Sequence, residues 1–311
     1  MQYRPVGKSG LKVSAIALGG WLTFGARVDE AISGEIIRAA LEQGINFIDL
    51  ADVYGAGAAE QVVGGLIGEL RREDLVLSSK VFWPMSDDPN DRGLGRKHIR
   101  QSVERTLRNL RTDYLDLYFC HREDPETPLE ETARAMDELV RQGKVLYWGT
   151  SVWQPRTLRK AHALAKRALH YAPQVEQPRY NLLDRHIEKR LMPTAARLGM
   201  GLVVWSPLAG GILTGKYNDT TPPESRGGQT DWLRGELTDE NLRRVRAFCE
   251  LAREMSVEPA QLALAWILAR DEISSVITGA TSVDQLRSNL GALDVRLGAD
   301  VQSRIAELFP A

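Results

Sequence analysis

The sequence predicts a single (β/α)8 barrel that spans residues 1–311. Eight short apolar runs of strand length alternate with longer stretches whose apolar residues recur at helical spacing. No linker or shift in composition divides the chain. An alternation of this kind builds a parallel sheet, and eight repeats close it into a barrel rather than leaving it open.

The strands are predicted from runs at residues 14–18, 46–49, 75–79, 115–120, 145–149, 174–176, 201–205 and 275–278. The helices between them are predicted at residues 29–43, 58–70, 97–110, 128–141, 156–167 and 187–198. In the third of these, Ile99, Val103 and Leu107 recur every four residues and form one apolar face.

Two segments depart from the plain repeat. Residues 3–12 predict a β-hairpin that turns at Gly7 and at Ser9-Gly10, ahead of the first barrel strand. Residues 209–238 are rich in Gly and Pro and interrupt the seventh repeat, and a loop of that length is usually functional. Further helices are expected at residues 240–255, 259–269 and 300–308.

Composition excludes several classes of function. The chain has 40 basic and 41 acidic residues, well mixed, so we expect no binding to nucleic acid. The two cysteines, Cys120 and Cys249, form no metal-binding or disulfide pattern, which favours a location in the reducing cytoplasm. The apolar run at residues 13–24 is broken by Ser and Gly, no cleavage pattern follows it, and no stretch is long enough for membrane insertion.

Four polar residues stand after three successive predicted strands. Asp49 and Tyr54 follow the second strand, Lys80 the third and His121 the fourth. Each alone has an ordinary explanation; Asp49, for instance, could cap the next helix. In a parallel barrel, however, the carboxyl ends of all strands open on one face, where active sites form. The four side chains are therefore expected to converge.

This set of side chains suits the protonation of a carbonyl oxygen. A tyrosine is a weak acid at neutral pH unless a neighbour stabilises its phenolate, which Lys80 would do while Asp49 keeps the lysine charged. His121 would hydrogen-bond the oxygen on which charge develops. The pattern fits neither a metal site nor acyl transfer. Because none of these groups supplies hydride, a nicotinamide cofactor is inferred.

The chain resembles the aldo-keto reductase superfamily, and within it the branch of the potassium-channel β-subunits and their bacterial and plant relatives. The resemblance covers nearly the whole chain. The motifs that carry it are FIDLADVYG at residues 47–55, HREDP at 121–125, YWGTS at 147–151, QPRYNLL at 177–183, WSPLAGGILTGKY at 205–217 and GATSVDQLRSN at 279–289.

The resemblance implies a catalytic tetrad made of Asp49, Tyr54, Lys80 and His121. It also implies that Ser151 and Gln177 hold the nicotinamide carboxamide. The full set of implied cofactor-binding residues is Gly20, Trp21, Asp49, Ser151, Gln177, Trp205, Ser206, Pro207, Leu208, Gly210, Lys216, Arg226, Gly279, Thr281, Gln285 and Asn289.

NADPH is the expected cofactor, with NADH as the alternative. Lys216 and Arg226 would favour the extra phosphate of NADPH, and no acidic residue that would reject it is evident. Residues 210–216 nearly match the P-loop motif, but Tyr217 stands where that motif requires a Ser or Thr to bind magnesium. No Gly-x-Gly-x-x-Gly fingerprint points to a Rossmann domain.

Four positions depart from the residues common among close relatives. Leu50 and Gly20 each stand where a Thr is usual, Arg27 replaces a Gln, and Ser288 replaces a Glu near the adenosine. These changes bear on how tightly the cofactor is held and how fast it exchanges, and leave the expected chemistry intact.

The substrate is expected to be a small carbonyl compound. The predicted substrate wall consists of Trp21, Tyr54, Phe82, Trp83, His121 and Trp153, with Trp232 as a further candidate. Aromatic walls suit hydrophobic or aryl carbonyls, although core or surface packing explains several of these side chains equally well.

Two functions remain open at this point. One is an active carbonyl reductase; the other is a redox-sensing or regulatory subunit that binds cofactor with little turnover. His121 favours the reductase, since the animal channel subunits typically carry Asn there. A homo-oligomer is also left open, because relatives occur as monomers, dimers, tetramers and octamers.

Overall fold

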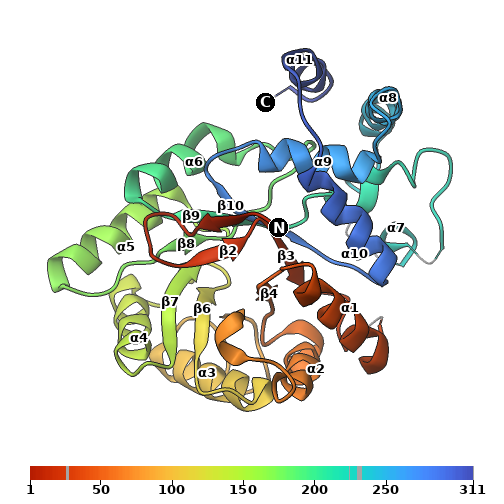
Figure 1. Cartoon of the computed structure of the whole chain (residues 1–311). Coiled ribbons are helices and arrows are strands. Elements are labelled where there is room, and N and C mark those ends of the chain that lie inside the picture. The colour runs from red at the N-terminus through yellow and green to blue at the C-terminus, as the bar shows by residue number, and fades with distance from the viewer. Residues whose placement is uncertain (26–27, 224, 230–232, 311) are drawn as a thin grey trace.

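The chain forms a closed barrel of eight parallel strands with helices on its outside, as predicted (Figure 1). The computed structural model describes residues 1–25, 28–223, 225–229 and 233–310. Around the barrel the strands follow the order β10-β3-β4-β5-β6-β7-β8-β9. Their bounds are β3 Ile16–Gly19, β4 Phe47–Asp49, β5 Val76–Val81, β6 Leu115–Cys120, β7 Val145–Thr150, β8 Val175–Glu176, β9 Gly201–Val204 and β10 Ile273–Thr278.

The outer helices lie close to their predicted positions. They are α1 Glu30–Glu42, α2 Ala58–Ile67, α3 Arg96–Leu110, α4 Leu129–Arg141, α5 Pro155–Ala168, α6 Ile187–Leu198, α8 Asp239–Glu254, α9 Pro259–Leu268, α10 Val283–Leu290 and α11 Ala299–Leu308. The apolar face predicted for α3 is buried against the barrel. The helix α10 was not predicted; it begins at Ser282, whose side chain accepts a hydrogen bond from the backbone N–H of Gln285.

The N-terminal hairpin closes one end of the barrel (Figure 1). Its strands β1 Tyr3–Pro5 and β2 Lys12–Ser14 pair antiparallel. Gly7 turns the hairpin with a φ of +57°, and a Cβ there would lie 2.3 Å from the carbonyl oxygen of Gly199. Only glycine therefore fits. The prediction that Ser14 begins the first barrel strand was wrong: it pairs with Tyr3, and the barrel strand begins at Ile16.

The inside of the barrel is apolar at the hairpin end and polar at the other. The apolar end is filled by the buried residues Val6, Val13, Ala17, Phe47, Val76, Leu117, Phe119, Val175, Val203 and Ile277. At the carboxyl ends of the strands, buried charged and polar side chains replace them, among them Asp49, Lys80 and Gln177. Burying such groups is costly unless each has a partner, so their presence marks this end as functional.

Backbone strain gathers at the same end. Of the eight non-glycine residues with positive φ in the described ranges, five lie in loops that follow barrel strands: Leu22, Ala56, Val152, Ser206 and Ala209. Such conformations cost on the order of 1 kcal/mol or more each and concentrate at ligand sites.

Within its described residues, the long segment after β9 includes the 3₁₀ helix η3 Ala209–Thr214 and the short helix α7 Arg226–Gln229. Trp232 and Arg27 lie outside the described residues. Across the described ranges, no helix combines the length and apolar character needed to cross a membrane.

Candidate active site

Tyr54 is presented by a tight turn directly after β4. The backbone N–H of Tyr54 donates to the carbonyl of Ala51, and the next residues, Gly55, Ala56 and Gly57, all have positive φ before α2 begins. The glycines adopt these angles at little cost. The turn therefore aims the Tyr54 ring back across the end of the barrel.

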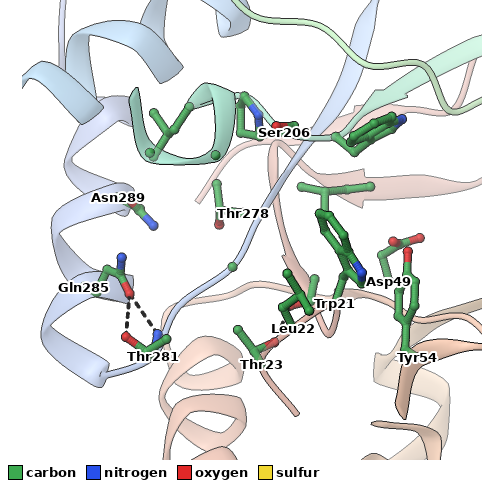
Figure 2. Close-up of a pocket in the computed structure, with 18 of the residues that line it drawn as sticks. Trp21, Leu22, Thr23, Asp49, Tyr54, Ser206, Thr278, Thr281, Gln285 and Asn289 are labelled. Carbon is green, nitrogen blue, oxygen red and sulfur yellow. Dashed lines mark hydrogen bonds between the residues drawn. The ribbon is translucent and has the colours of Figure 1, made fainter. Parts of the chain in front are cut away.

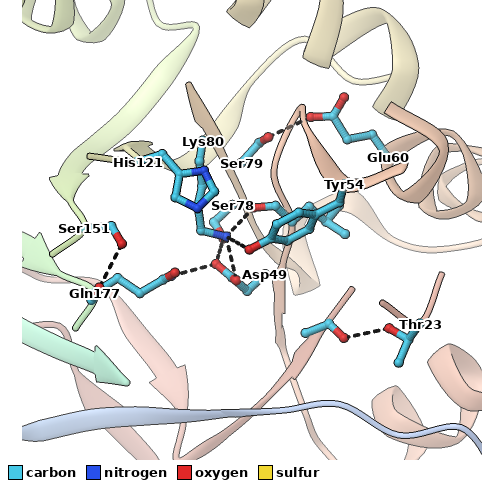
Figure 3. A network of polar contacts seen from close by, with 12 residues as sticks. Thr23, Asp49, Tyr54, Glu60, Ser78, Ser79, Lys80, His121, Ser151 and Gln177 are labelled. Carbon is cyan, nitrogen blue, oxygen red and sulfur yellow. Dashed lines mark hydrogen bonds and ion pairs between the residues drawn. The ribbon is translucent and has the colours of Figure 1, made fainter. Parts of the chain in front are cut away.

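Lys80, on β5, is the centre of the site (Figure 3). Its Nζ donates to Asp49 Oδ2 at 2.7 Å, to the carbonyl of Leu50 at 2.6 Å and to Tyr54 Oη at 3.1 Å. The Lys80 side chain is fully buried and that of Asp49 is 4% exposed. An ammonium group has three donors, and all three are used here. The position of Lys80 against Tyr54 is thereby fixed.

Asp49 is held in turn by two neutral donors. Ser78 Oγ and Gln177 Nε2 each donate to Asp49 Oδ1 at 2.8 Å. Both oxygens of the carboxylate therefore have hydrogen-bond partners, which offsets the cost of burying this group.

The protonation states follow from these contacts. Burial alone would lower the pKa of Lys80, but Asp49 and Tyr54 raise it above its ordinary value, so the lysine is charged at neutral pH. Burial raises the pKa of Tyr54 above 10, against the opposing effect of Lys80. The phenol is therefore protonated at neutral pH. Sequence reasoning stressed the lysine, whereas burial has the larger effect on the tyrosine.

His121, at the end of β6, is a neutral imidazole. Its pKa lies well below the ordinary value because the ring is buried and because Lys80 and Arg122 are positively charged nearby. The ring stands edge-on to Tyr54, with ring centres 6.1 Å apart. Its Nδ1 is buried and has no hydrogen-bond partner among the described residues. A neutral imidazole donates from one nitrogen only, which leaves one donor for a ligand oxygen.

The polar group opens onto a cleft of about 940 Å³ that crosses the carboxyl end of the barrel. Figure 2 shows Asp49 and Tyr54 at one end and Gln285 and Asn289 at the other. Of the predicted site residues, the cleft is lined by Trp21, Asp49, Tyr54, Trp83, His121, Ser151, Gln177, Trp205, Ser206, Pro207, Leu208, Gly210, Lys216, Gly279, Thr281, Gln285 and Asn289. Residues from the ends of all eight barrel strands, or from the segments that follow them, are thus brought together.

Four predicted residues do not line this cleft: Gly20, Lys80, Phe82 and Trp153. Lys80 is fully buried, and its Nζ contacts Asp49 and Tyr54, which do line the cleft. Phe82 packs on Trp83 and the core, and Trp153 is a buried core residue, 3% exposed. In the structure, Phe82 and Trp153 therefore contribute to packing and do not line the predicted substrate wall. The side chain of Arg226 lies outside the described part of the structure.

A glycine-rich turn forms the wall of the cleft after β9. Gly210 and Gly211 have φ of 66° and 99°, and a Cβ on Gly211 would lie 2.6 Å from Lys216 Nζ. The end of the Lys216 side chain thus lies over the turn at Gly211. Closely spaced backbone amides beside a lysine are typical of a diphosphate site.

At the far end, Gln285 Oε1 accepts hydrogen bonds from the backbone N–H and the hydroxyl of Thr281 (Figure 2). Asn289 Nδ2 is buried and has no hydrogen-bond partner in the described structure. Asp284 also lines this end, although no acidic residue was expected there. Its side chain is 95% exposed.

The residues of the cleft fit a dinucleotide. Three buried polar atoms, His121 Nδ1, Ser206 Oγ and Asn289 Nδ2, lack partners among the described residues, and all three residues line the cleft. Such groups are normally satisfied by a ligand or water. Ser151 donates to the carbonyl of Gln177 and accepts a long hydrogen bond from Arg122 Nη1, which leaves one lone pair of the Ser151 hydroxyl oxygen to accept from a carboxamide.

Two departures from the usual residues are neighbours in the structure. A Cβ on Gly20 would lie 2.6 Å from Leu50 Cδ2 and 3.1 Å from Phe24. Leu50 thus occupies the space that a side chain at position 20 would need.

Several cleft residues were not predicted: Leu22, Thr23, Arg122, Thr278 and Asp284. Leu22 and Thr23 come from the loop after β3. Arg122 follows His121 directly, and its place after a strand end was the signal available in the sequence. In the described part of the chain, no cluster of three metal-ligating side chains is found.

Comparison with known proteins agrees with this geometry. Residues 15–309 match the model of the Aldo/keto reductase family. The chain is 44% identical to a protein of Arabidopsis thaliana named "Probable voltage-gated potassium channel subunit beta", over 95% of this chain and 92% of that protein. It is 43% identical to a protein of the same name from Oryza sativa subsp. japonica, with the same coverage. The chain belongs to the aldo/keto reductase family.

Proposed function

We propose that the protein reduces aldehydes or ketones to alcohols with NADPH, and that Tyr54 supplies the proton. The observation that carries this proposal is the hydrogen-bonded chain Asp49–Lys80–Tyr54, which ends in a phenol at the mouth of a dinucleotide-sized cleft. The nicotinamide, when bound, supplies hydride to the carbonyl carbon.

Tyr54 acts as the general acid. As the carbonyl carbon gains hydride, its oxygen becomes an alkoxide, which is far more basic than a phenolate. The proton therefore moves from Tyr54 Oη although burial raises the pKa of Tyr54. Lys80, 3.1 Å from that oxygen, then stabilises the phenolate. Asp49 fixes Lys80 and does not itself transfer the proton.

His121 orients the carbonyl. Its ring faces the same end of the cleft as Tyr54 and stays neutral, so one N–H is available to the carbonyl oxygen. A neutral donor positions the oxygen without competing with Tyr54 for the role of acid.

The cofactor would lie along the cleft with its ends held by different loops. Ser151 and Gln177 would bind the carboxamide, and the turn with Gly210 and Lys216 would bind the diphosphate. Thr281, Gln285 and Asn289 would bind the adenosine end. Lys216 supports NADPH, whereas Asp284 at the adenosine end favours NADH, so the two cofactors are to be compared directly.

A second candidate function is a cofactor-binding, redox-sensing subunit with little turnover. The two relatives named as probable channel β-subunits support it. Against it stands His121, which completes the acid site.

Steady-state oxidation of NADPH and NADH with a panel of small aldehydes tests the proposal. A reductase gives turnover at 1 s⁻¹ or more, roughly the lower end of ordinary enzyme rates. Tight NADPH binding with turnover well below about 0.01 s⁻¹ for every aldehyde would instead favour the sensing subunit.

A further inference from the structure

Arg122 places a positive charge at the catalytic end of the cleft, and among the described residues it has no ionic partner. Its side chain is half-buried and lines the cleft next to His121. Nη1 donates to the carbonyl of His121 at 2.5 Å and lies 3.5 Å from Ser151 Oγ. These contacts use one nitrogen of a group that has five N–H donors. No carboxylate of the described residues lies within ion-pair distance of the guanidinium.

The nearby acids are engaged elsewhere. Glu176 is fully buried, and its oxygens accept hydrogen bonds from the Thr150 hydroxyl and the backbone N–H of Trp153. Glu123 accepts from the backbone N–H of Gln154. Burial lowers the pKa of Arg122, and Tyr54 and then Glu176 only partly offset this effect. Binding of an anion would therefore stabilise an arginine in this state.

The charge lies close to where the carbonyl must be. The guanidinium carbon of Arg122 is 5.6 Å from the ring centre of Trp83. The Trp83 ring is 6.1 Å from His121, and His121 is 6.1 Å from Tyr54. Cation, indole and imidazole thus form a continuous wall that leads away from the proton donor. The other charged groups named at this end, Lys80 and Asp49, form an ion pair with each other.

We propose that the substrate carries a carboxylate besides its carbonyl group, and that Arg122 binds this carboxylate while Trp83 packs on the adjoining carbon frame. This inference rests on the proposed reductase function. The planar guanidinium fork matches a planar carboxylate. Substrates of the class of aldehyde acids, aliphatic or aromatic, have this combination of groups.

The test compares two aldehydes that differ in charge but hardly in shape, 4-formylbenzoate and 4-formylbenzamide. The wild-type protein with NADPH is expected to show a kcat/KM at least about 10-fold higher for the benzoate, the usual worth of a hydrogen bond to a charged group. Arg122→Met should lower kcat/KM for the benzoate about 10- to 100-fold and change the benzamide value by less than about threefold. Arg122→Lys should fall between.

Arg100→Met is the matched control. Arg100 is exposed on α3, outside the cleft, so this variant loses the same charge without touching the site. It should keep the wild-type preference. The Kd for NADPH is measured for every variant by fluorescence titration.

Three results overturn the inference: no preference for the benzoate in the wild type, an equal loss of both substrates in Arg122→Met, or a weakened NADPH affinity in that variant. The last two would make Arg122 a support for His121 or for the cofactor. If the wild type reduces neither aldehyde, calorimetry with benzoate and benzamide in the presence of NADP⁺ decides. If benzoate binds more tightly than benzamide and Arg122→Met abolishes this difference, the carboxylate site is supported although the proposed reductase function fails. If the two compounds bind equally, the carboxylate site is refuted as well.

Discussion

Replacing Lys80 with methionine tests the energetics of the site, because methionine keeps a similar length but has no charge. In this variant Asp49 Oδ2 loses its partner at 2.7 Å, while Oδ1 keeps Ser78 and Gln177. Both members of the pair are almost fully buried. Breaking such a pair leaves an unpaired buried charge and costs about 3–5 kcal/mol. We expect the free energy of unfolding, measured with urea, to fall by that amount.

The same substitution should nearly abolish turnover. Tyr54 Oη loses the charged hydrogen-bond partner that lies 3.1 Å away. Removing a group that stabilises charge in a buried site lowers kcat by about 10²–10³, and loss of the aligned acid adds to this. We expect steady-state kcat to fall about 10³-fold or more.

A second substitution separates the two effects. Asp49→Asn in the Lys80→Met background removes the orphaned carboxylate, so the free energy of unfolding should recover by about 2 kcal/mol while kcat stays low. The reasoning is refuted if Lys80→Met is stable to within about 1 kcal/mol of the wild type and keeps a tenth of its kcat.

Two further predictions concern other titratable groups. Burial raises the pKa of Asp52 to about 7, and its Oδ1 has no partner among the described residues. The folded protein therefore keeps a proton that the unfolded chain releases near pH 4, so stability falls as pH rises from about 4 to about 7. The Asp52→Asn variant should not show this fall. Its free energy of unfolding in urea should exceed that of the wild type by about 2–4 kcal/mol at pH 8 and differ little at pH 4. Parallel curves of unfolding free energy against pH for the two proteins would contradict this prediction. His121→Asn should lower kcat about 100-fold at unchanged NADPH affinity. Because the pKa of His121 is well below its ordinary value, the wild-type kcat/KM should stay level from pH 6 to pH 8; a fall there that His121→Asn abolishes would show a catalytic imidazolium.

The barrel could be predicted because its signal is repeated eight times. Most strand bounds agree within one or two residues, since each strand is a short apolar run between polar loops. The helix α10 escaped prediction because it is short and largely exposed, with Leu286 and Asn289 as its buried residues. Ser14 was assigned to the barrel strand instead of the hairpin because both strands lie in one apolar run, and the sequence does not show where the first ends and the second begins.

The convergence of the tetrad could be predicted from the order of strand ends, but the direction of single side chains could not. Trp83 faces the cleft while its neighbour Phe82 packs on the core, and both follow the same strand. Trp153 has the residue type of a substrate wall, yet it is buried. Contacts such as that between Gly20 and Leu50 join residues from different loops, and only the three-dimensional structure shows them.

Tyr54→Phe tests the central claim most directly, because the variant removes one oxygen atom and leaves the ring. Affinity for NADPH is measured by fluorescence titration, and carbonyl reduction is measured by single-turnover oxidation of bound NADPH with an aldehyde. We predict a Kd within about threefold of the wild type and a rate at least about 10³-fold lower. Reduction at the wild-type rate in Tyr54→Phe would show that another group donates the proton.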